Sequence, residues 1–292
     1  MLPKPAAPPH QLCRNQARRA NHAIILPMKL SGIQKLTLLD FPGHTAATVF
    51  TPGCNFRCPF CHNADLVLGM RREGASPDEV RPRSPHGAFP SYPTDEFFAF
   101  LDKRQKLLDG ICITGGEPLL QPGLAEFCEE IRNRGFKVKL DTNGSHPERL
   151  RPLIEDGLVD YVAMDVKNAP ARYAETVGIP YFDIAPVHES VNLLKEKRVP
   201  CEFRTTVVRE LHTAEDLREI ARWLAEPHGS PASASRPYEG DAPWFLQSFI
   251  DAEGVLGGTG RFRAWPPQDL RKILPELQRT LPRTELRGVK EA

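Results

Sequence analysis

The chain has 292 residues, enough for one large domain or two small ones, and a chain of this length needs no disulfides to bury a stable core. Lys and Arg number 38 against 37 Asp and Glu, so a net charge of +1 predicts neither nucleic acid nor an anionic membrane as a partner. No apolar run approaches the roughly 20 residues that a membrane-spanning helix needs, which excludes an integral membrane protein.

Proline, at 29 residues, is about twice as frequent as usual. It is concentrated in the segments 1–29, 70–93 and 227–243, which we expect to be loops or tails because proline fixes φ and removes an N–H donor. The first segment carries five basic residues and no acidic one. A transit peptide would need a cleavage site of small residues after an apolar core, which is missing. We therefore predict a disordered extension over residues 1–27, with Met28 as the physiological start.

Short apolar or β-branched runs alternate with amphipathic runs along the rest of the chain. The runs predict strands at 45–51, 111–114, 136–141, 159–166, 201–208 and 244–250. They predict helices at 94–109, 123–134, 147–156, 186–198, 214–225 and 268–279. Six such units predict an α/β fold with parallel strands, either a partial barrel or a doubly wound sheet, with functional loops at the carboxyl ends of the strands. We expect one domain over 28–282 and a C-terminal tail over 283–292.

Three of the seven cysteines follow the first strand: Cys54, Cys58 and Cys61. An odd number of cysteines without an export signal argues against a disulfide framework. A zinc ion would need a fourth ligand, and His62 is the only local candidate. A 4Fe–4S cluster tolerates three cysteines and leaves one iron open, so the spacing favours a cluster. The cysteines of the other predicted elements are expected to be buried small side chains: Cys112, Cys128 and Cys201.

The second strand ends in the run Thr114-Gly115-Gly116-Glu117-Pro118. Two glycines allow a backbone to approach a ligand closely, and the carboxylate of Glu117 can bind an ammonium group. A tight turn into a helix is the structural alternative.

Polar residues also follow the next two strands. Asp141, Thr142 and Asn143 suit ribose hydroxyls, although the same residues also suit a turn before the 147–156 helix. Asp165 and Lys167 end the fourth strand, where a surface ion pair is the alternative. The last two strands add isolated residues of types that are more often structural: Arg204, Thr205, Thr206, His212, Gln247 and Phe249.

The chain resembles the radical S-adenosylmethionine superfamily in two motifs. The first is the Cx3CxΦC motif of Cys54, Cys58, Phe60 and Cys61, and the second is Gly115-Gly116-Glu117-Pro118. More narrowly, the chain resembles the activating proteins of anaerobic ribonucleoside-triphosphate reductase. Four segments carry this narrower resemblance, which covers about residues 28–250: 31–35, 39–43, 49–63 and 141–144.

The resemblance implies a partial (β/α)6 barrel with parallel strands. It also implies a 4Fe–4S cluster on Cys54, Cys58 and Cys61, whose open iron is chelated by the amino and carboxylate groups of S-adenosylmethionine. Gly115, Gly116 and Glu117 would hold the methionyl ammonium, and Phe60 would lie against the adenine. Asp141, Thr142 and Asn143 would reach the ribose or the carboxylate. The remaining residues expected around the cofactor are His62, Asp165, Lys167, Arg204 and, stacked near the adenine, His212.

The activity that the resemblance implies is reductive cleavage of S-adenosylmethionine to a 5′-deoxyadenosyl radical, which takes a hydrogen from a glycine Cα of a partner enzyme. The expected partner is anaerobic ribonucleoside-triphosphate reductase, with a flavodoxin- or ferredoxin-type electron donor, in the cytoplasm. One alternative is a radical enzyme acting on a small molecule, such as a 7-carboxy-7-deazaguanine synthase, which would have an enclosed pocket. A non-catalytic zinc or electron-transfer module is another alternative, but it leaves the double-glycine loop unexplained.

Overall fold

The computed structural model describes residues 28–68, 91–226 and 242–289. The predicted disordered extension at 1–27 lies outside the described residues, as do most of the two proline-rich loops at 70–93 and 227–243. Within the described residues, no helix is long and apolar enough to cross a membrane.

One eight-stranded sheet forms the centre of the described structure, and its strands follow one another in chain order. Strands β2 to β8 are parallel, and β1 is antiparallel to β2. A doubly wound sheet reverses its strand order, whereas this sheet never does, so the partial-barrel prediction is confirmed. The strands are β1 (Gly32–Thr37), β2 (Ala46–Thr51), β3 (Gly110–Gly115), β4 (Lys137–Thr142), β5 (Tyr161–Asp165), β6 (Cys201–Val207), β7 (Trp244–Ser248) and β8 (Thr284–Arg287).

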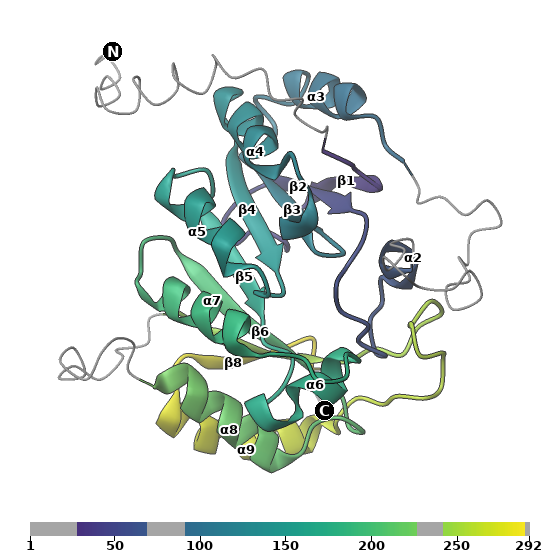
Figure 1. Cartoon of the computed structure of the whole chain (residues 1–292), viewed down its shortest axis with the longest axis vertical. Coiled ribbons are helices and arrows are strands. Elements are labelled where there is room, and N and C mark those ends of the chain that lie inside the picture. The colour runs from purple at the N-terminus through teal and green to yellow at the C-terminus, as the bar shows by residue number, and fades with distance from the viewer. Residues whose placement is uncertain (1–27, 69–90, 227–241, 290–292) are drawn as a thin grey trace.

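Helices cover the outer face of the curved sheet, while α2 lies on the opposite side (Figure 1). The α-helices are α2 (Ala64–Val67), α3 (Thr94–Asp102), α4 (Leu124–Asn133), α5 (Pro147–Glu155), α6 (Tyr173–Val177), α7 (Ala185–Lys195), α8 (Ala214–Ala225) and α9 (Pro267–Thr280), and two short 3₁₀ turns are η1 (Pro118–Leu120) and η2 (Pro170–Arg172). Five of the six predicted helices agree with the structure to within a few residues. The sixth, α3, ends at Asp102 instead of residue 109, because the chain turns there to enter β3.

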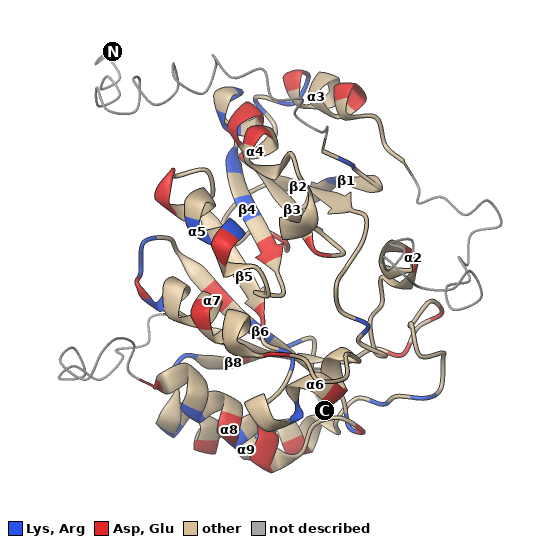
Figure 2. Cartoon of the chain, viewed as in Figure 1, with Lys and Arg blue, Asp and Glu red and all other residues tan. Residues whose placement is uncertain are grey.

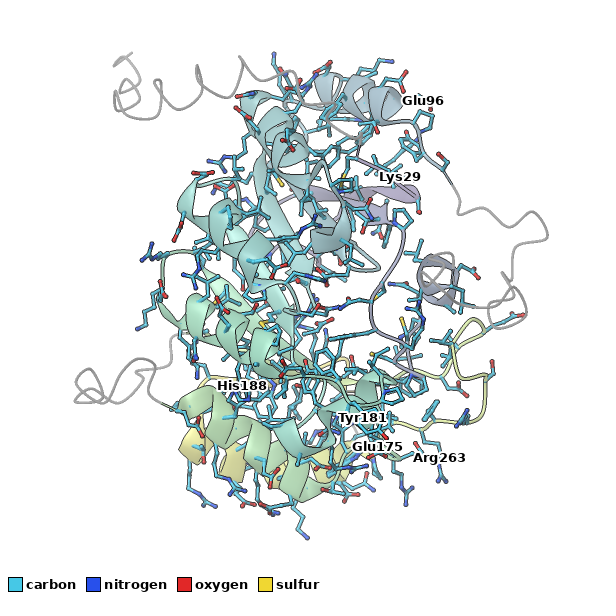
Figure 3. The ribbon with its side chains drawn as sticks, viewed as in Figure 1. Lys29, Glu96, Glu175, Tyr181, His188 and Arg263 are labelled. Atoms are coloured by element: carbon cyan, nitrogen blue, oxygen red, sulfur yellow. The ribbon has the colours of Figure 1, made fainter. Side chains whose placement is uncertain are left out.

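The apolar core fills the layer between the sheet and these helices. Alternate strand residues such as Val49, Ile113 and Leu140 point into this layer and are fully buried. On α7, His188 packs against Trp223 of α8 with ring centroids 4.5 Å apart (Figure 3). The other face of each strand carries polar residues into the inside of the curve. The sheet therefore separates an apolar outer layer from a polar interior.

Both charge signs are mixed along the solvent faces of α8 and α9 (Figure 2). Arg218 of α8 binds Glu276 of α9 at 2.7 Å, so the two helices are also joined by an ion pair at the surface. The α8 helix begins at a capping box in which Thr213 and Asp216 bond each other's backbone N–H.

We expected a C-terminal tail over 283–292. Residues 284–287 instead form β8, which pairs with β7. Thr284 is fully buried, and Arg287 binds both oxygens of the buried Glu202 at 3.2 and 3.4 Å. A run such as Thr-Glu-Leu-Arg has little strand character of its own. These tertiary contacts make it a strand.

Replacing Arg287 with Ala should lower the free energy of unfolding by about 1–3 kcal/mol, because Glu202 would stay buried without its cation. Arg287 is partly exposed, which places the expected loss below that for a fully buried pair. Urea denaturation followed by circular dichroism measures this. Arg279→Ala, at an exposed position of α9, is the matched control and should change the free energy by less than about 0.5 kcal/mol. Equal stability of the two variants would contradict the assigned role.

Candidate active site

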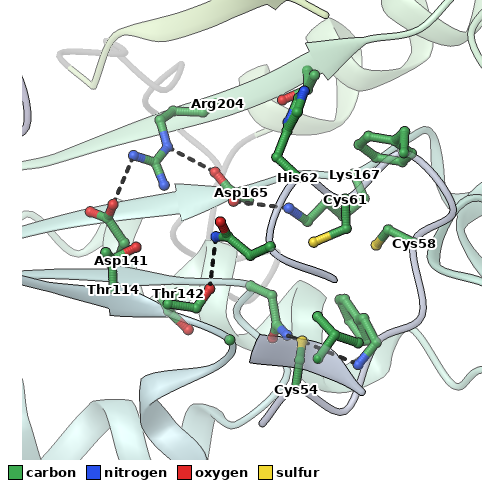
Figure 4. Close-up of a pocket in the computed structure, with 18 of the residues that line it drawn as sticks. Cys54, Cys58, Cys61, His62, Thr114, Asp141, Thr142, Asp165, Lys167 and Arg204 are labelled. Atoms are coloured by element: carbon green, nitrogen blue, oxygen red, sulfur yellow. Dashed lines mark hydrogen bonds and ion pairs between the residues drawn. The ribbon is translucent and has the colours of Figure 1, made fainter. Parts of the chain in front are cut away.

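One pocket lies at the carboxyl ends of the strands, and it collects most of the residues predicted from the sequence. Thirteen of them line it: Cys54, Cys58, Phe60, Cys61, His62, Gly115, Gly116, Asp141, Thr142, Asn143, Asp165, Lys167 and Arg204. Glu117 and His212 are buried behind its wall instead. In Figure 4 the thiols of Cys58 and Cys61 occupy one end of the pocket, and Asp141 and Arg204 lie at the other. The functional loops thus meet where a parallel α/β sheet predicts them.

The three cysteines lie on the loop between β2 and α2, and all three are free thiols. Burial raises the pKa of Cys54 to about 12 and raises the pKa values of Cys58 and Cys61 as well, while the charge of Lys167 opposes each increase. A bound metal centre would supply the positive charge that such buried thiolates need. Three free thiols on one pocket wall therefore fit a cluster.

Gly115 and Gly116 allow the backbone at the end of β3 to lie directly against the backbone that follows β2. Their role is therefore not limited to making space for a ligand. The N–H of Gly116 donates to Thr51 at 2.9 Å, and the N–H of Glu117 donates to Gly53 at 2.7 Å. A Cβ on Gly116 would lie 1.8 Å from the carbonyl oxygen of Gly53, and Gly115 has φ of +123°. The glycines thus fix the segment that leads directly into Cys54, and they also line the pocket.

The side chain of Glu117 accepts three hydrogen bonds from the protein and is not exposed to the pocket. Its Oε1 accepts from the N–H of Leu119 at 3.0 Å and from the hydroxyl of Thr142 at 2.8 Å, and its Oε2 accepts from the N–H of Asn143 at 2.7 Å. Its carboxylate joins the turn after β3 to the turn after β4, and both turns line the pocket. A contact between Glu117 and the methionyl ammonium stays a prediction.

Ions of alternating sign connect three strands across the floor of the pocket. Lys167 binds Asp165 at 2.9 Å, and Arg204 bridges Asp165 at 2.8 Å and Asp141 at 3.1 Å (Figure 4). Lys139, which is almost fully buried, binds the second oxygen of Asp141. Burial alone would raise the pKa values of both aspartates, yet the neighbouring cations hold them below the usual range. The floor is thus ionised, paired and rigid.

A second network ties the cysteine loop to the turn after β4. Asn143 donates to the Oδ1 of Asn55 at 3.0 Å and lies 3.9 Å from the sulfur of Cys54. Ser145 donates to Asn143 and accepts from Asn55 at 2.8 Å. The side chain of Asn143 is therefore mostly bonded to other residues of the protein. Its amide nitrogen also lies near the thiol of Cys54.

His212 does not line the pocket. Its Nδ1 accepts from the N–H of Val208 at 3.1 Å, so its Nε2 carries the proton and donates to the carbonyl of Lys167 at 2.8 Å. Burial lowers its pKa, which keeps the ring neutral. The ring packs edge-on against Phe60, with centroids 6.5 Å apart. His212 therefore supports Phe60 from behind, and its place near the adenine stays a prediction.

His62 lies at the rim of the pocket with its ring already engaged. Its Nε2 bonds the carbonyl of Ile250, and its ring stacks on Phe249 with centroids 5.3 Å apart. The loop after β7 holds the cysteine loop further, because Leu256 donates to the carbonyl of Cys61 at 2.9 Å. These contacts position the cysteine loop and leave His62 unsuited as a fourth zinc ligand.

Several positioning residues were missed by the sequence analysis: Asn55, Arg57, Lys139, Ser145 and Gly178. A local pattern indicates only Lys139, since it lies two residues before Asp141 and thus on the same face of a strand. The others act through contacts between segments far apart in the chain, such as the close approach of Gly178 to the carbonyl of Arg57.

Replacing Gly116 with Ala should displace the cysteine loop, because the new methyl group overlaps the carbonyl of Gly53. We expect a loss of about 1–3 kcal/mol in stability and less iron per chain after anaerobic reconstitution. Iron and sulfide assays together with thermal denaturation measure both effects. Gly32→Ala is the matched control, since a Cβ there meets no atom within 4 Å. A fully reconstituted, equally stable Gly116→Ala protein would refute this account of the double glycine.

The Glu117 carboxyl should make stability depend on pH. Burial raises its pKa to about 7 from an ordinary value of 4.5, so the folded protein holds this proton more tightly than the unfolded chain does. That stabilisation is complete below pH 4.5 and is lost as the pH rises to about 7. The difference in unfolding free energy between wild type and Glu117→Gln should therefore fall by about 3 kcal/mol across this window. Urea titrations at several pH values measure it, and a pH-independent difference would contradict the prediction.

Comparison with known proteins agrees with this geometry. The family model described as "Radical SAM superfamily" matches residues 48–224. A protein of Methanocaldococcus jannaschii, named provisionally as a glycyl-radical enzyme activating enzyme, is 34% identical over 201 residues, covering 68% of this chain and 75% of its own. The 7-carboxy-7-deazaguanine synthase of Methanopyrus kandleri is 38% identical over 133 residues, covering 44% and 51%. The crystal structure of QueE from Escherichia coli has a TM-score of 0.50 at 15% identity, covering 89% and 93%.

The chain belongs to the radical S-adenosylmethionine superfamily, because the family model spans more than half of it. Within that superfamily it is a radical enzyme similar to the glycyl-radical enzyme activating enzymes. The likeness to QueE extends to the fold alone.

Proposed function

We propose that this protein is the activase of anaerobic ribonucleoside-triphosphate reductase. The observation that carries the proposal is that three free cysteine thiols and an ionised floor share one pocket whose rim, in the described part of the chain, has two exposed residues. His62 and Asn63 line this pocket and are exposed. An exposed rim suits a protein segment that enters from outside, whereas a small-molecule enzyme would enclose its substrate. The similarity to an activating enzyme over 68% of the chain supports the same conclusion.

The residues fit a 4Fe–4S cluster on Cys54, Cys58 and Cys61 with S-adenosylmethionine beside it. When bound, this pair would supply one-electron reductive cleavage of S-adenosylmethionine to methionine and 5′-deoxyadenosine, with the electron from an external reductant and the hydrogen from a glycine Cα of the protein substrate. The protein substrate keeps the unpaired electron on that glycine. A flavodoxin- or ferredoxin-type protein would supply the electron, and a cytoplasmic location stays a prediction.

The chain's own residues bind and orient the reactants. Lys167 is positive next to Cys58 and Cys61, so it suits a carboxylate bound near the thiols. Asn143 and Thr142 line the pocket on turns that Glu117 holds in place, and the buried Phe60 offers an apolar surface for a base. Arg204 and Asp165 bind each other, so their charges offset one another. The pair still offers polar groups to a substrate that lies on the pocket floor. These features position the reactants.

A synthase acting on a small heterocycle is the second candidate. The similarity to a 7-carboxy-7-deazaguanine synthase over 44% of the chain favours it, as does a pocket floor rich in charged groups. This candidate predicts a deazaguanine-type product from a small-molecule substrate, without any protein partner.

Anaerobic mixing of the reconstituted protein with S-adenosylmethionine, a reductant and the reductase tests the proposal. Electron paramagnetic resonance should show a glycyl radical on the reductase, with 5′-deoxyadenosine formed in step. Cys58→Ala should give neither product, because the pocket has no fourth cysteine among the described residues. Cys128→Ala, at a buried position of α4, is the matched control and should behave as wild type. Cleavage of S-adenosylmethionine with no radical on the reductase would refute the proposed target.

A further inference from the structure

Most polar side chains of the pocket are already bonded to the protein. Asn63 donates to Gly115, Thr142 to Glu117 and Asn143 to Asn55, and the floor ions bind one another. The hydroxyl of Thr114, on β3, has no hydrogen-bond partner among the described residues, and the same holds for two lining side chains on neighbouring strands. Thr206 of β6 and Gln247 of β7 have no side-chain hydrogen bond to any described residue, although both face the pocket.

These two residues are adjacent in space, because Thr206 and Gln247 are register partners in the parallel β6–β7 pair. Partners in one register project from the same face of a sheet. Thr206 also lies two residues beyond Arg204, so the pair adjoins the ionised floor. Two residues beyond Gln247, Phe249 stacks on His62 of the cysteine loop. The two free polar groups thus lie between the floor and the cysteine loop.

The chemistry of this pair selects a neutral ligand. Neither side chain is charged, and the neighbouring floor cations, Lys167 and Arg204, are each already paired with a carboxylate. A side-chain amide carries both N–H donors and a carbonyl acceptor. In an extended chain, the N–H and C=O of one residue point to the same side, as in the hydrogen-bonded pairs of an antiparallel ladder. One glutamine can therefore satisfy both groups of one residue.

We propose that Gln247 binds the main-chain N–H and C=O of the target glycine in an extended segment of the protein substrate, with the hydroxyl of Thr206 beside it. This inference rests on the proposed activase function. Both hydrogen bonds flank the glycine Cα, so they would orient the hydrogen that is removed. Gln247 is a substrate-binding residue in this account, and it contributes nothing to the cysteine ligands.

The test uses a synthetic peptide spanning the glycine segment of the reductase and the same peptide with N-methylglycine at that position. The KM for each peptide is measured from 5′-deoxyadenosine formation by reconstituted wild type, Gln247→Leu and the matched control Gln268→Leu, which changes an exposed glutamine of α9. Losing one hydrogen bond should raise KM about tenfold. In wild type and Gln268→Leu, N-methylation should therefore raise KM about tenfold. Gln247→Leu should have a raised KM for the glycine peptide and respond to N-methylation by less than about twofold.

Equal responses of wild type and Gln247→Leu to N-methylation would overturn the inference, because Gln247 would then not contact that N–H. If Gln247→Leu fails to fold or to take up iron, Gln247→Glu replaces it: the carboxylate keeps the acceptor for the N–H and loses the donor for the C=O. That variant should keep the N-methylation response while its KM rises for both peptides, and an unchanged KM would overturn the inference. A parallel reaction of wild type with the whole reductase distinguishes the two proposals. A glycyl radical there with equal responses refutes this inference alone, whereas no radical refutes the activase function and this inference with it.

Discussion

The close contact between the end of β3 and the segment that follows β2 determines where the cysteine loop begins. Gly116 lies so near the carbonyl of Gly53 that only hydrogen fits between them, and the N–H groups of Gly116 and Glu117 donate to Thr51 and Gly53. A parallel pair of strands normally separates after its last hydrogen bond. Here two further backbone bonds keep the chains together, so Cys54 leaves the sheet in a fixed direction. Every other contact of the cysteine loop depends on this starting point.

Burial of charge inside the curved sheet is the second constraint. An unpaired ion there would cost several kcal/mol, and a chain of paired ions avoids most of that cost while it restricts each side chain to one rotamer. Lys139, the most buried member of the chain, shows that the pairing extends below the pocket as well as around it. The floor owes its rigidity to these pairs, and that rigidity fixes the position of whatever binds above it.

Local patterns were enough to predict the middle strands, the helices and the loops that carry chemistry. Apolar runs such as residues 111–114 encode a strand wherever they pack, and parallel strands bring their carboxyl ends together, which is why Asp141, Asp165 and Arg204 could be placed in one site. The edge strands could not be predicted in this way. β1 has an exposed, largely polar sequence, and β8 has four residues whose strand conformation depends on β7 and on Glu202. Nothing in the local sequence of either strand contains that information.

The same distinction explains why two of the expected cofactor residues, Glu117 and His212, lie behind the pocket wall. Glu117 and His212 were assigned direct roles because their residue types can bind an ammonium or stack on a base, and the sequence does not show how many partners a side chain already has. The structure gives Glu117 three donors and His212 two backbone partners, which leaves neither free for a ligand. Gln247 shows the converse. It was grouped with residues that are more often structural, yet it has no described partner and lines the pocket. Residue type shows what a side chain can bind, and only the count of its satisfied hydrogen bonds shows whether it is still available to do so.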